Sequence, residues 1–305
     1  MALSFAAANL ICALLWLGDL VARGFRIQWL LRGLGQRIGF RDAFRFNAWG
    51  EAGCALTPMR VAGEPMRLLG MLRAGVPAAA AFVAIAIEVL AAWPVIISLA
   101  AIGLWRFAPE WLTHARPALL AGVRHRAGWV VVVLLLTVIV GVMAGRALRR
   151  AGREPRRAWR RILVYGRRVS WWPIAASAPL TAVNVLARSA MLPILALSLP
   201  SHPPVGVMLV GSFGLLYSQL LLPTPAGAGV VELGFLAGAA GNLTTGEGTS
   251  AAVLLLAWRF WSVGAGAALG LLLAARTLEW REIRGLFRRA PGSAAVAGDG
   301  TESRH

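Results

Sequence analysis

Residues 57–64 read TPMRVAGE, and residues 224–232 read TPAGAGVVE, which follows a similar pattern. Both stretches place Thr-Pro, a short linker containing Gly and a carboxylate inside a segment that is otherwise apolar. Pro and Gly interrupt helices, and interrupted backbone at membrane depth is tolerated only where protein buries it or where it lines a cavity. A matched pair of interrupted segments in the two halves of a membrane protein predicts the substrate site of a transporter.

The composition indicates an integral membrane protein. Of the 305 residues, 58% are hydrophobic, and the mean hydropathy is +0.67. Several apolar runs exceed about 18 residues, which is long enough for a membrane-spanning helix. The net charge of +18 is compatible with nucleic-acid binding, but the arginines lie in the connections between apolar runs, as in the positive-inside pattern. We therefore expect a multi-pass protein of the bacterial inner membrane without a nucleic-acid partner.

Five apolar segments are long enough to span a bilayer, for which a helix needs about 20 residues. They lie at about residues 3–22, 76–104, 128–145, 171–199 and 251–275. Arginine-rich connections favour the cytoplasmic side. We expect three such connections in the cytoplasm, with six, ten and five arginines, at residues 23–45, 146–170 and 276–289. The segments expected outside are the N-terminus and residues 105–127, 200–204 and 242–250.

This orientation constrains the two interrupted segments. Residues 46–75 begin and end in the cytoplasm, and about 30 residues are too few for two full spans and a turn. They predict a re-entrant helical hairpin with Pro58 and Gly63 at its tip. Residues 205–241 begin and end outside and predict a second hairpin from the opposite face. The predicted fold is an all-α polytopic membrane protein with about five spans and two opposed re-entrant hairpins, related as an inverted repeat.

Two further segments are strongly basic or of low complexity. Residues 149–168 combine many arginines with Trp159, Ile162, Leu163 and Tyr165, which predicts an amphipathic helix on the anionic lipids of the inner leaflet. A plain basic connection is the alternative. Residues 1–280 are expected to form one transmembrane domain, followed by a basic and then disordered cytoplasmic tail at 281–305.

Ionisable side chains within the predicted membrane segments are the candidates for function. Each costs about 2.5–3.5 kcal/mol on insertion scales, so each needs a partner or a task. The set comprises Asp19, Glu51, Glu64, Glu88, Glu232, Arg67, Arg188 and Arg259. We expect a wet, charged cavity at the midplane, where arginines hold a phosphate and carboxylates hold an amine or relay protons.

The alternative is that these Glu and Arg side chains pair internally and only fix the helix packing. For Glu64 and Glu232, the coincidence of a charge with a broken helix favours function. Asp19, close to the end of the first span, is expected to be structural. Both interpretations remain open for Glu88, Arg188 and Arg259.

Motifs for metals, cofactors or covalent catalysis are not found. The histidines fall in connections or at the C-terminus and lack metal-ligand spacing. There is no P-loop, no dinucleotide fingerprint and no nucleophile motif. We expect neither enzyme activity nor a cofactor.

A set of residues follows in order along the chain. It consists of Pro58-x4-Gly63-Glu64-x2-Arg67, Gly75-Val76, Glu88, Leu222-Pro223-x-Pro225-Ala226-Gly227-Ala228-Gly229-x2-Glu232 and Arg259. Together these residues resemble the transmembrane domain of lysylphosphatidylglycerol synthase and its stand-alone, flippase-like relatives. The resemblance runs through most of residues 1–280. It implies that the family's motif positions are occupied by Gly63, Glu64, Arg67, Pro225, Gly227, Gly229, Glu232 and Arg259.

We expect these eight residues, together with Glu88 and Arg188, to contact the substrate. The chain departs from the family pattern at two places. The second motif more usually carries Gly-Gly after Pro, where this chain has Ala226-Gly227. In the span after the first motif, the Glu is commonly followed by Arg and then Asp, and this chain has Val89 and Ala92 in those places.

The resemblance implies a lipid as the partner. We expect an inner-membrane translocase that moves a phospholipid or lipid-linked head group between leaflets by alternating access around the charged cavity. The alternative is a non-transporting accessory that holds or presents lipid to a partner glycosyltransferase or synthase. The chain ends soon after its last predicted span, so we do not expect the soluble aminoacyl-transferase domain of the bifunctional synthases.

Overall fold

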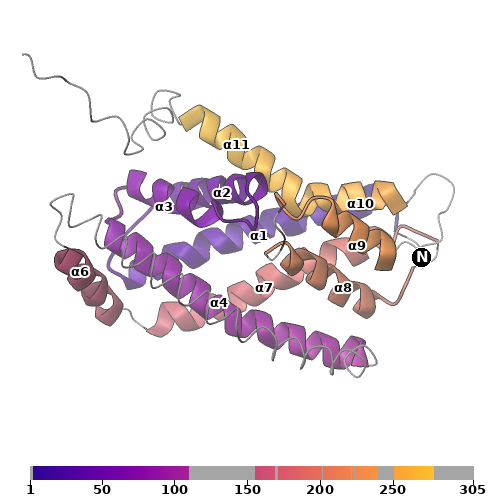
Figure 1. Ribbon diagram of the computed structural model, residues 1–305, viewed down its shortest axis with the longest axis horizontal. Coiled ribbons are helices and arrows are strands. Elements are labelled where there is room, and N and C mark those ends of the chain that lie inside the picture. Colours follow the sequence, from indigo (N-terminus) through magenta and orange to yellow (C-terminus); the bar gives the residue numbers. More distant parts are fainter. Residues whose placement is uncertain are drawn as a thin grey trace, which may run out of the picture.

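The computed structural model describes residues 3–109, 155–168, 171–200, 202–220, 222, 224–238 and 251–277. Figure 1 shows that these residues form helices, and no strand occurs among them. The helices are α1 (Phe5–Gly33), α2 (Phe40–Leu56), α3 (Gly63–Arg73), α4 (Ala78–Phe107), α6 (Pro155–Arg168), α7 (Trp171–Ala196), α8 (Val205–Ser218), α9 (Val230–Gly238), α10 (Ala251–Arg259), the π-helix η2 (Phe260–Gly264) and α11 (Ala265–Thr277).

The predicted all-α polytopic membrane fold is confirmed. In the described part of the chain, four stretches are long and apolar enough to cross a membrane: α1, α4, α7 and the continuous stretch Ala251–Thr277. They correspond to four of the five predicted spans. The fifth, at residues 128–145, lies outside the described residues.

The prediction that residues 23–45 form a basic connection is wrong over its first part. Helix α1 begins at a Ser4 cap, whose hydroxyl accepts a hydrogen bond from the Ala7 amide at 3.2 Å, and it continues to Gly33. It stops where Gly35 takes a left-handed φ of 76°, a conformation that glycine adopts without strain. Arg23 and Arg26 therefore lie on a helix and not in a loop, and both are largely buried.

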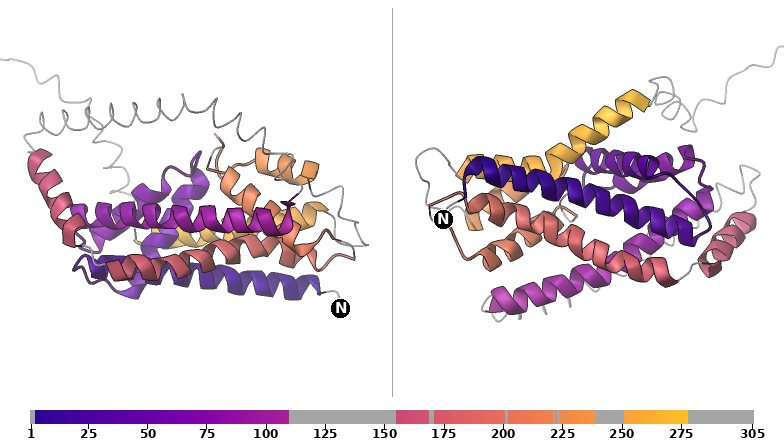
Figure 2. Two further views of the ribbon diagram at one scale, coloured as in Figure 1. Left: turned by 90° about the horizontal axis from the view of Figure 1, so that it is seen from below. Right: turned by 180° about the vertical axis from the view of Figure 1, so that it is seen from behind.

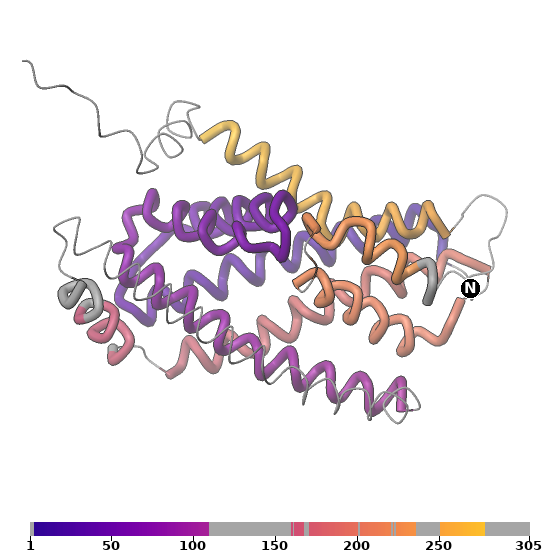
Figure 3. Tube along the Cα trace, in the orientation of Figure 1, coloured from indigo at the N-terminus to yellow at the C-terminus, as the bar shows by residue number. Residues whose placement is uncertain are grey.

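Each interrupted segment forms two short helices joined at a break. We call α2–α3 the first hairpin, with its tip at residues 57–62, and α8–α9 the second hairpin, with its tip at residues 219–229. The two hairpins enter from opposite ends of the long axis, and their tips meet near its middle (Figures 1 and 3). Pro58 and Pro225 form an isolated antiparallel bridge, and the Met59 amide donates a hydrogen bond to the Leu222 carbonyl at 3.2 Å.

Local chemistry explains the break of the first hairpin. Thr57 has an extended backbone, which is the conformation favoured before proline. Its hydroxyl donates to the Gly53 carbonyl at 2.7 Å and accepts from the Ala62 amide at 3.0 Å, so one side chain supplies polar groups at the end of α2 and the start of α3. Met59 and Arg60 then take left-handed φ values of 52° and 59°.

Two clusters of buried apolar residues lie on either side of the middle of the molecule. One joins the start of α1 to the end of α7 and to α8–α10, and the other joins the end of α1 to α2, α3 and α4. Along α1 the first cluster includes Ala8 and Cys12, and the second begins at Ile27. The stretch between them, near the middle of α1, is where the charged residues lie.

Helix α6 confirms that a helix forms within the basic stretch at 149–168. It contacts α4 (Figure 2). Ile162 and Tyr165, which belong to its predicted apolar face, are partly buried against the second cluster. Its position on the anionic leaflet stays a prediction.

Candidate functional site

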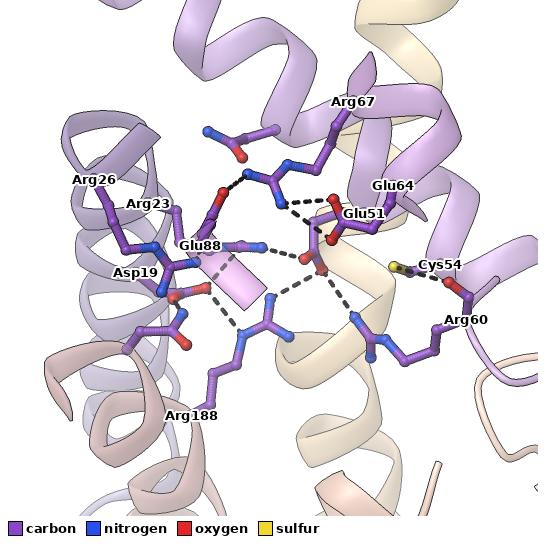
Figure 4. A network of polar contacts seen from close by, with 12 residues as sticks. Asp19, Arg23, Arg26, Glu51, Cys54, Arg60, Glu64, Arg67, Glu88 and Arg188 are labelled. Atoms are coloured by element: carbon purple, nitrogen blue, oxygen red, sulfur yellow. Dashed lines mark hydrogen bonds and ion pairs between the residues drawn. The ribbon is translucent and has the colours of Figure 1, made fainter. Parts of the chain in front are cut away.

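A network of charged side chains lies between the two apolar clusters (Figure 4). It draws on α1, on both helices and the tip of the first hairpin, on α4 and on α7. Its charged members are Asp19, Arg23, Arg26, Glu51, Arg60, Glu64, Arg67, Glu88 and Arg188. Five are arginines and four are carboxylates, so these described members leave one positive charge in excess.

Glu51, on α2, receives arginines from three elements. Arg23 of α1 pairs with its Oε1. Arg188 of α7 approaches its Oε2 at 2.9 Å, and Arg60 of the tip at 3.8 Å. The same Arg60 donates a hydrogen bond at 3.2 Å to Gln219, on the opposite tip. Glu51 is thus connected through one arginine to the point where the two hairpins meet.

Asp19 links α1 to α7. Its carboxylate pairs with Arg23 at 2.8 Å and with Nε of Arg188 at 3.0 Å, and it accepts a hydrogen bond from Asn184. The side chain is 0% exposed. A carboxylate so deeply buried needs these partners, because an unpaired charge in a low-dielectric interior is strongly unfavourable.

Glu88, near the middle of α4, joins α1 to the first hairpin. Arg26 of α1 and Arg67 of α3 each pair with one of its oxygens. Arg26 also donates to the Thr181 hydroxyl at 3.0 Å, and Arg67 also pairs with Glu64 at 3.0 Å. The side chain of Glu88 is 3% exposed, whereas that of Glu64 is 47% exposed, so Glu64 is the accessible carboxylate of this arm.

A polar cavity of about 210 Å³ adjoins this arm of the network. Charged groups line one side of it: Arg26, Arg67, Glu64 and Glu88. The lining is completed by Thr181 and Asn184 of α7 and by Val89, Ala92, Trp93 and Ile96 of α4. The structure thus has a charged cavity between α1, α3, α4 and α7, and the binding of a substrate there stays a prediction.

The carboxylate of the second motif has a simpler environment. Glu232, in the first turn of α9, pairs with Arg259 at 2.7 Å and accepts the Gly229 amide at 2.7 Å. Arg259 also donates to the Ala226 carbonyl at 3.0 Å. The π-helix η2 begins directly after Arg259, and π-type distortions within α-helices are frequent at functional sites.

The structure brings four predicted site residues into the charged region: Glu64, Arg67 and Glu88 share one set of ion pairs, and Arg188 belongs to the other set, around Asp19 and Glu51. Glu232 and Arg259 form their own pair instead, and Pro225, Gly227 and Gly229 shape the second tip. Gly63 opens α3 close to the Cys54 sulfur, where a Cβ would come within 2.2 Å of that atom.

Three members of the network were not predicted: Arg23, Arg26 and Arg60. A signal for the first two was present, because Asp19, Arg23 and Arg26 are spaced at i, i+4 and i+7 and therefore share a helix face. Arg60 stands inside the first motif itself. The positive-inside count placed Arg23 and Arg26 in a connection between spans, so they were not considered as site residues.

Groups of three or more His, Cys, Asp or Glu that could hold a metal ion are not found in the part of the chain that the structure describes. Every carboxylate of the network has an arginine partner. The arrangement is suited to holding a charged ligand by exchange of ion pairs.

Comparison with known proteins gives one match. A family model described as "Lysylphosphatidylglycerol synthase TM region" matches residues 1–270. Neither the curated proteins nor the solved structures gave a significant match.

Proposed function

The chain belongs to the lysylphosphatidylglycerol synthase TM region family, and we propose that it moves a phospholipid or a lipid-linked head group between the leaflets of the bacterial inner membrane. Membership indicates a membrane protein associated with lipid handling. The proposal goes beyond membership in three respects: the chain translocates lipid, the two hairpins are re-entrant elements, and no chemical step takes place. Its support comes from the position of the charged network.

The observation that carries the proposal is that nine charged side chains meet halfway along apolar helices, beside the contact between the two tips. Charged groups within membrane segments are costly, and they mark pathways for substrates or ions. Simple packing of α1 against α7 would need at most one ion pair. The network instead joins six elements, and part of it faces a cavity.

The two tips are suited to act as the moving parts. Among the described residues of the two tips, the shared contacts are one proline bridge, one backbone hydrogen bond and the Arg60–Gln219 hydrogen bond. This is a small set of contacts, so separating the tips costs less than separating packed helices. Arg60 would exchange its partners Glu51 and Gln219 for the charged head group of a lipid as the tips part. Alternating access would then expose the network to each leaflet in turn.

The test is a leaflet assay in proteoliposomes that contain the purified full chain and a fluorescent phospholipid. A membrane-impermeant reductant bleaches only the outer-leaflet label, so its extent reports movement. We expect Glu64→Gln and Glu232→Gln to abolish lipid movement while the proteins still purify as stable particles. An amide keeps the shape of the side chain and removes its charge.

Asp42→Asn is the matched control. Asp42 is 43% exposed and forms a 3.6 Å pair with Arg45, away from the network, so this variant should move lipid like the unmodified protein. Lipid movement that persists in both glutamate variants would overturn the role of these carboxylates. Protein that binds lipid and never moves it would overturn translocation and support an accessory that presents lipid to a partner.

A further inference from the structure

Two cavities adjoin each other along α4 and α7. The polar cavity of about 210 Å³ reaches Ile96 on α4 and Asn184 on α7. A groove of about 470 Å³ begins at Leu99 and at Val185 on the same two helices and extends to α8. Leu99 follows Ile96 within one helical turn, and Val185 is the chain neighbour of Asn184. Since α4 and α7 run in the same direction side by side (Figure 2), the groove continues the polar cavity.

The polar cavity carries charges of both signs. Two arginines and two carboxylates line it, so these four groups balance, and the excess positive charge of the network belongs to its other arm. The half-exposed carboxylate is Glu64, and the half-exposed aromatic residue is Trp93, whose exposed fraction is 46%. A cavity lined by both a carboxylate and an indole is a suitable environment for an amine, because both groups attract a cation.

Two arginines that line the same cavity have unused hydrogen-bond donors. Nε of Arg26 and Nε of Arg67 are buried and have no hydrogen-bond partner. Both residues are at least nine-tenths buried, with exposed fractions of 8% and 9%. Buried donors are normally paired, and a phosphate oxygen is the acceptor that an arginine side chain binds best.

The groove, in contrast, is almost entirely apolar. Leu99 and Leu104 of α4, Leu186 of α7 and Phe213 of α8 are among its lining residues. Gly211 and Gly214 of α8 also line it, and a Cβ at either position would meet open space. A space of this size and polarity is unfavourable for water and favourable for a hydrocarbon chain.

We propose that the polar cavity and the groove together bind one phospholipid whose head group is zwitterionic and bears an amine. The amine contacts Glu64 beside Trp93, the phosphate lies toward Arg26 and Arg67, and one acyl chain occupies the groove between α4, α7 and α8. This inference rests on the proposed function, since it names the binding site and the head-group class of the lipid that is moved.

The experiment measures binding and not movement. The purified full chain in detergent binds phosphatidylethanolamine that carries a fluorophore on one acyl chain, and unlabelled phosphatidylethanolamine, phosphatidylcholine or phosphatidylglycerol competes. We expect phosphatidylethanolamine to compete best, because it offers both a phosphate and a primary amine. In Glu64→Gln this preference should disappear.

Gly211→Leu tests the groove. The new side chain projects into the space that the acyl chain would fill, so we expect at least about tenfold weaker binding. Gly18→Leu is the matched control, because Gly18 is also an exposed glycine of an apolar helix with open space at its Cβ, and it does not line the groove.

The outcomes separate the inference from the proposed function. Gly211→Leu and Gly214→Leu proteins that bind the labelled lipid like the Gly18→Leu protein would overturn the acyl-chain site. Equal competition by all three lipids would overturn the amine-bearing head group. Binding as expected, without movement between leaflets, would leave this inference standing and defeat translocation. Lipid movement that Gly211→Leu and Gly214→Leu leave unchanged would defeat the acyl-chain site and leave translocation standing.

Discussion

The two hairpins have similar backbones and very different electrostatics. In each, a helix stops, two or more residues take left-handed φ values, and a second helix restarts with a glutamate in its first turn. In the first hairpin Glu64 belongs to a network that reaches α1, α4 and α7. In the second, Glu232 pairs with one arginine and caps its own helix.

The two hairpins therefore share a backbone break and differ in the charged groups around it. A break with a restarting helix can be repeated in both halves of a chain, because Pro and Gly specify it locally. The charges that surround each break come from distant helices and need not be repeated. The first hairpin therefore carries the larger share of the buried charge, and the second carries a pair that can be exchanged at lower cost.

The largest expected effect separates the two environments by stability. Among the described residues, Glu88→Gln removes the only carboxylate that pairs with Arg26 and one of two that pair with Arg67. Leaving a buried charge unpaired costs about 3–5 kcal/mol. Glu232→Gln concerns a side chain that is 30% exposed, so we expect a loss of about 1 kcal/mol or less. Chemical denaturation in mixed micelles measures both free energies of unfolding.

A second substitution sharpens this comparison. Adding Arg26→Met to Glu88→Gln removes the orphaned charge, so it should recover part of the lost stability without restoring lipid movement. Equal and small losses for Glu88→Gln and Glu232→Gln would show that the two hairpins do not differ as their ion pairs indicate.

Sequence reasoning identified the elements that local signals specify. Pro58 and Pro225, with the glycines near them, predicted both breaks, and the position of Glu64 and Glu232 after the breaks was predicted correctly. The network was predicted only in part. Arg23 and Arg26 were missed because the face of a helix, and not the sequence position of an arginine, decides which side chains meet.

The contact between the tips was also beyond the reach of the sequence. It joins residues more than 150 positions apart, such as Arg60 and Gln219, and no local pattern encodes such a pairing. The pairing of Glu232 with Arg259 is not encoded by a local pattern either. The sequence suggested one cavity for both glutamates, and the structure shows one network and one separate pair.

A smaller effect is expected from packing against the network. At Gly50 in the first hairpin, a Cβ would lie 2.5 Å from Cγ of Arg67, so Gly50→Ala must displace the arginine that joins Glu64 to Glu88. Overpacking of this kind costs about 1–3 kcal/mol. In the second hairpin, a Cβ at Gly214 meets nothing within 4 Å, and Gly214→Ala should be neutral or slightly stabilising. Denaturation in micelles compares the pair, and equal effects would contradict the tighter packing of the first hairpin.

The smallest effect concerns Ala226 in the second tip. Ala226 has a left-handed φ of 48°, which costs a residue with a Cβ about 1–2 kcal/mol. Ala226→Gly removes that strain, although the more flexible glycine also favours the unfolded chain, so we expect a net gain in stability of about 1 kcal/mol or less. Ala228→Gly is the control, because Ala228 has no left-handed φ, and there glycine should only destabilise. Chemical denaturation in micelles measures the free energy of unfolding of both variants. A loss of stability in Ala226→Gly would mean that the hydrogen bond from Arg259 to the Ala226 carbonyl holds this conformation without net strain.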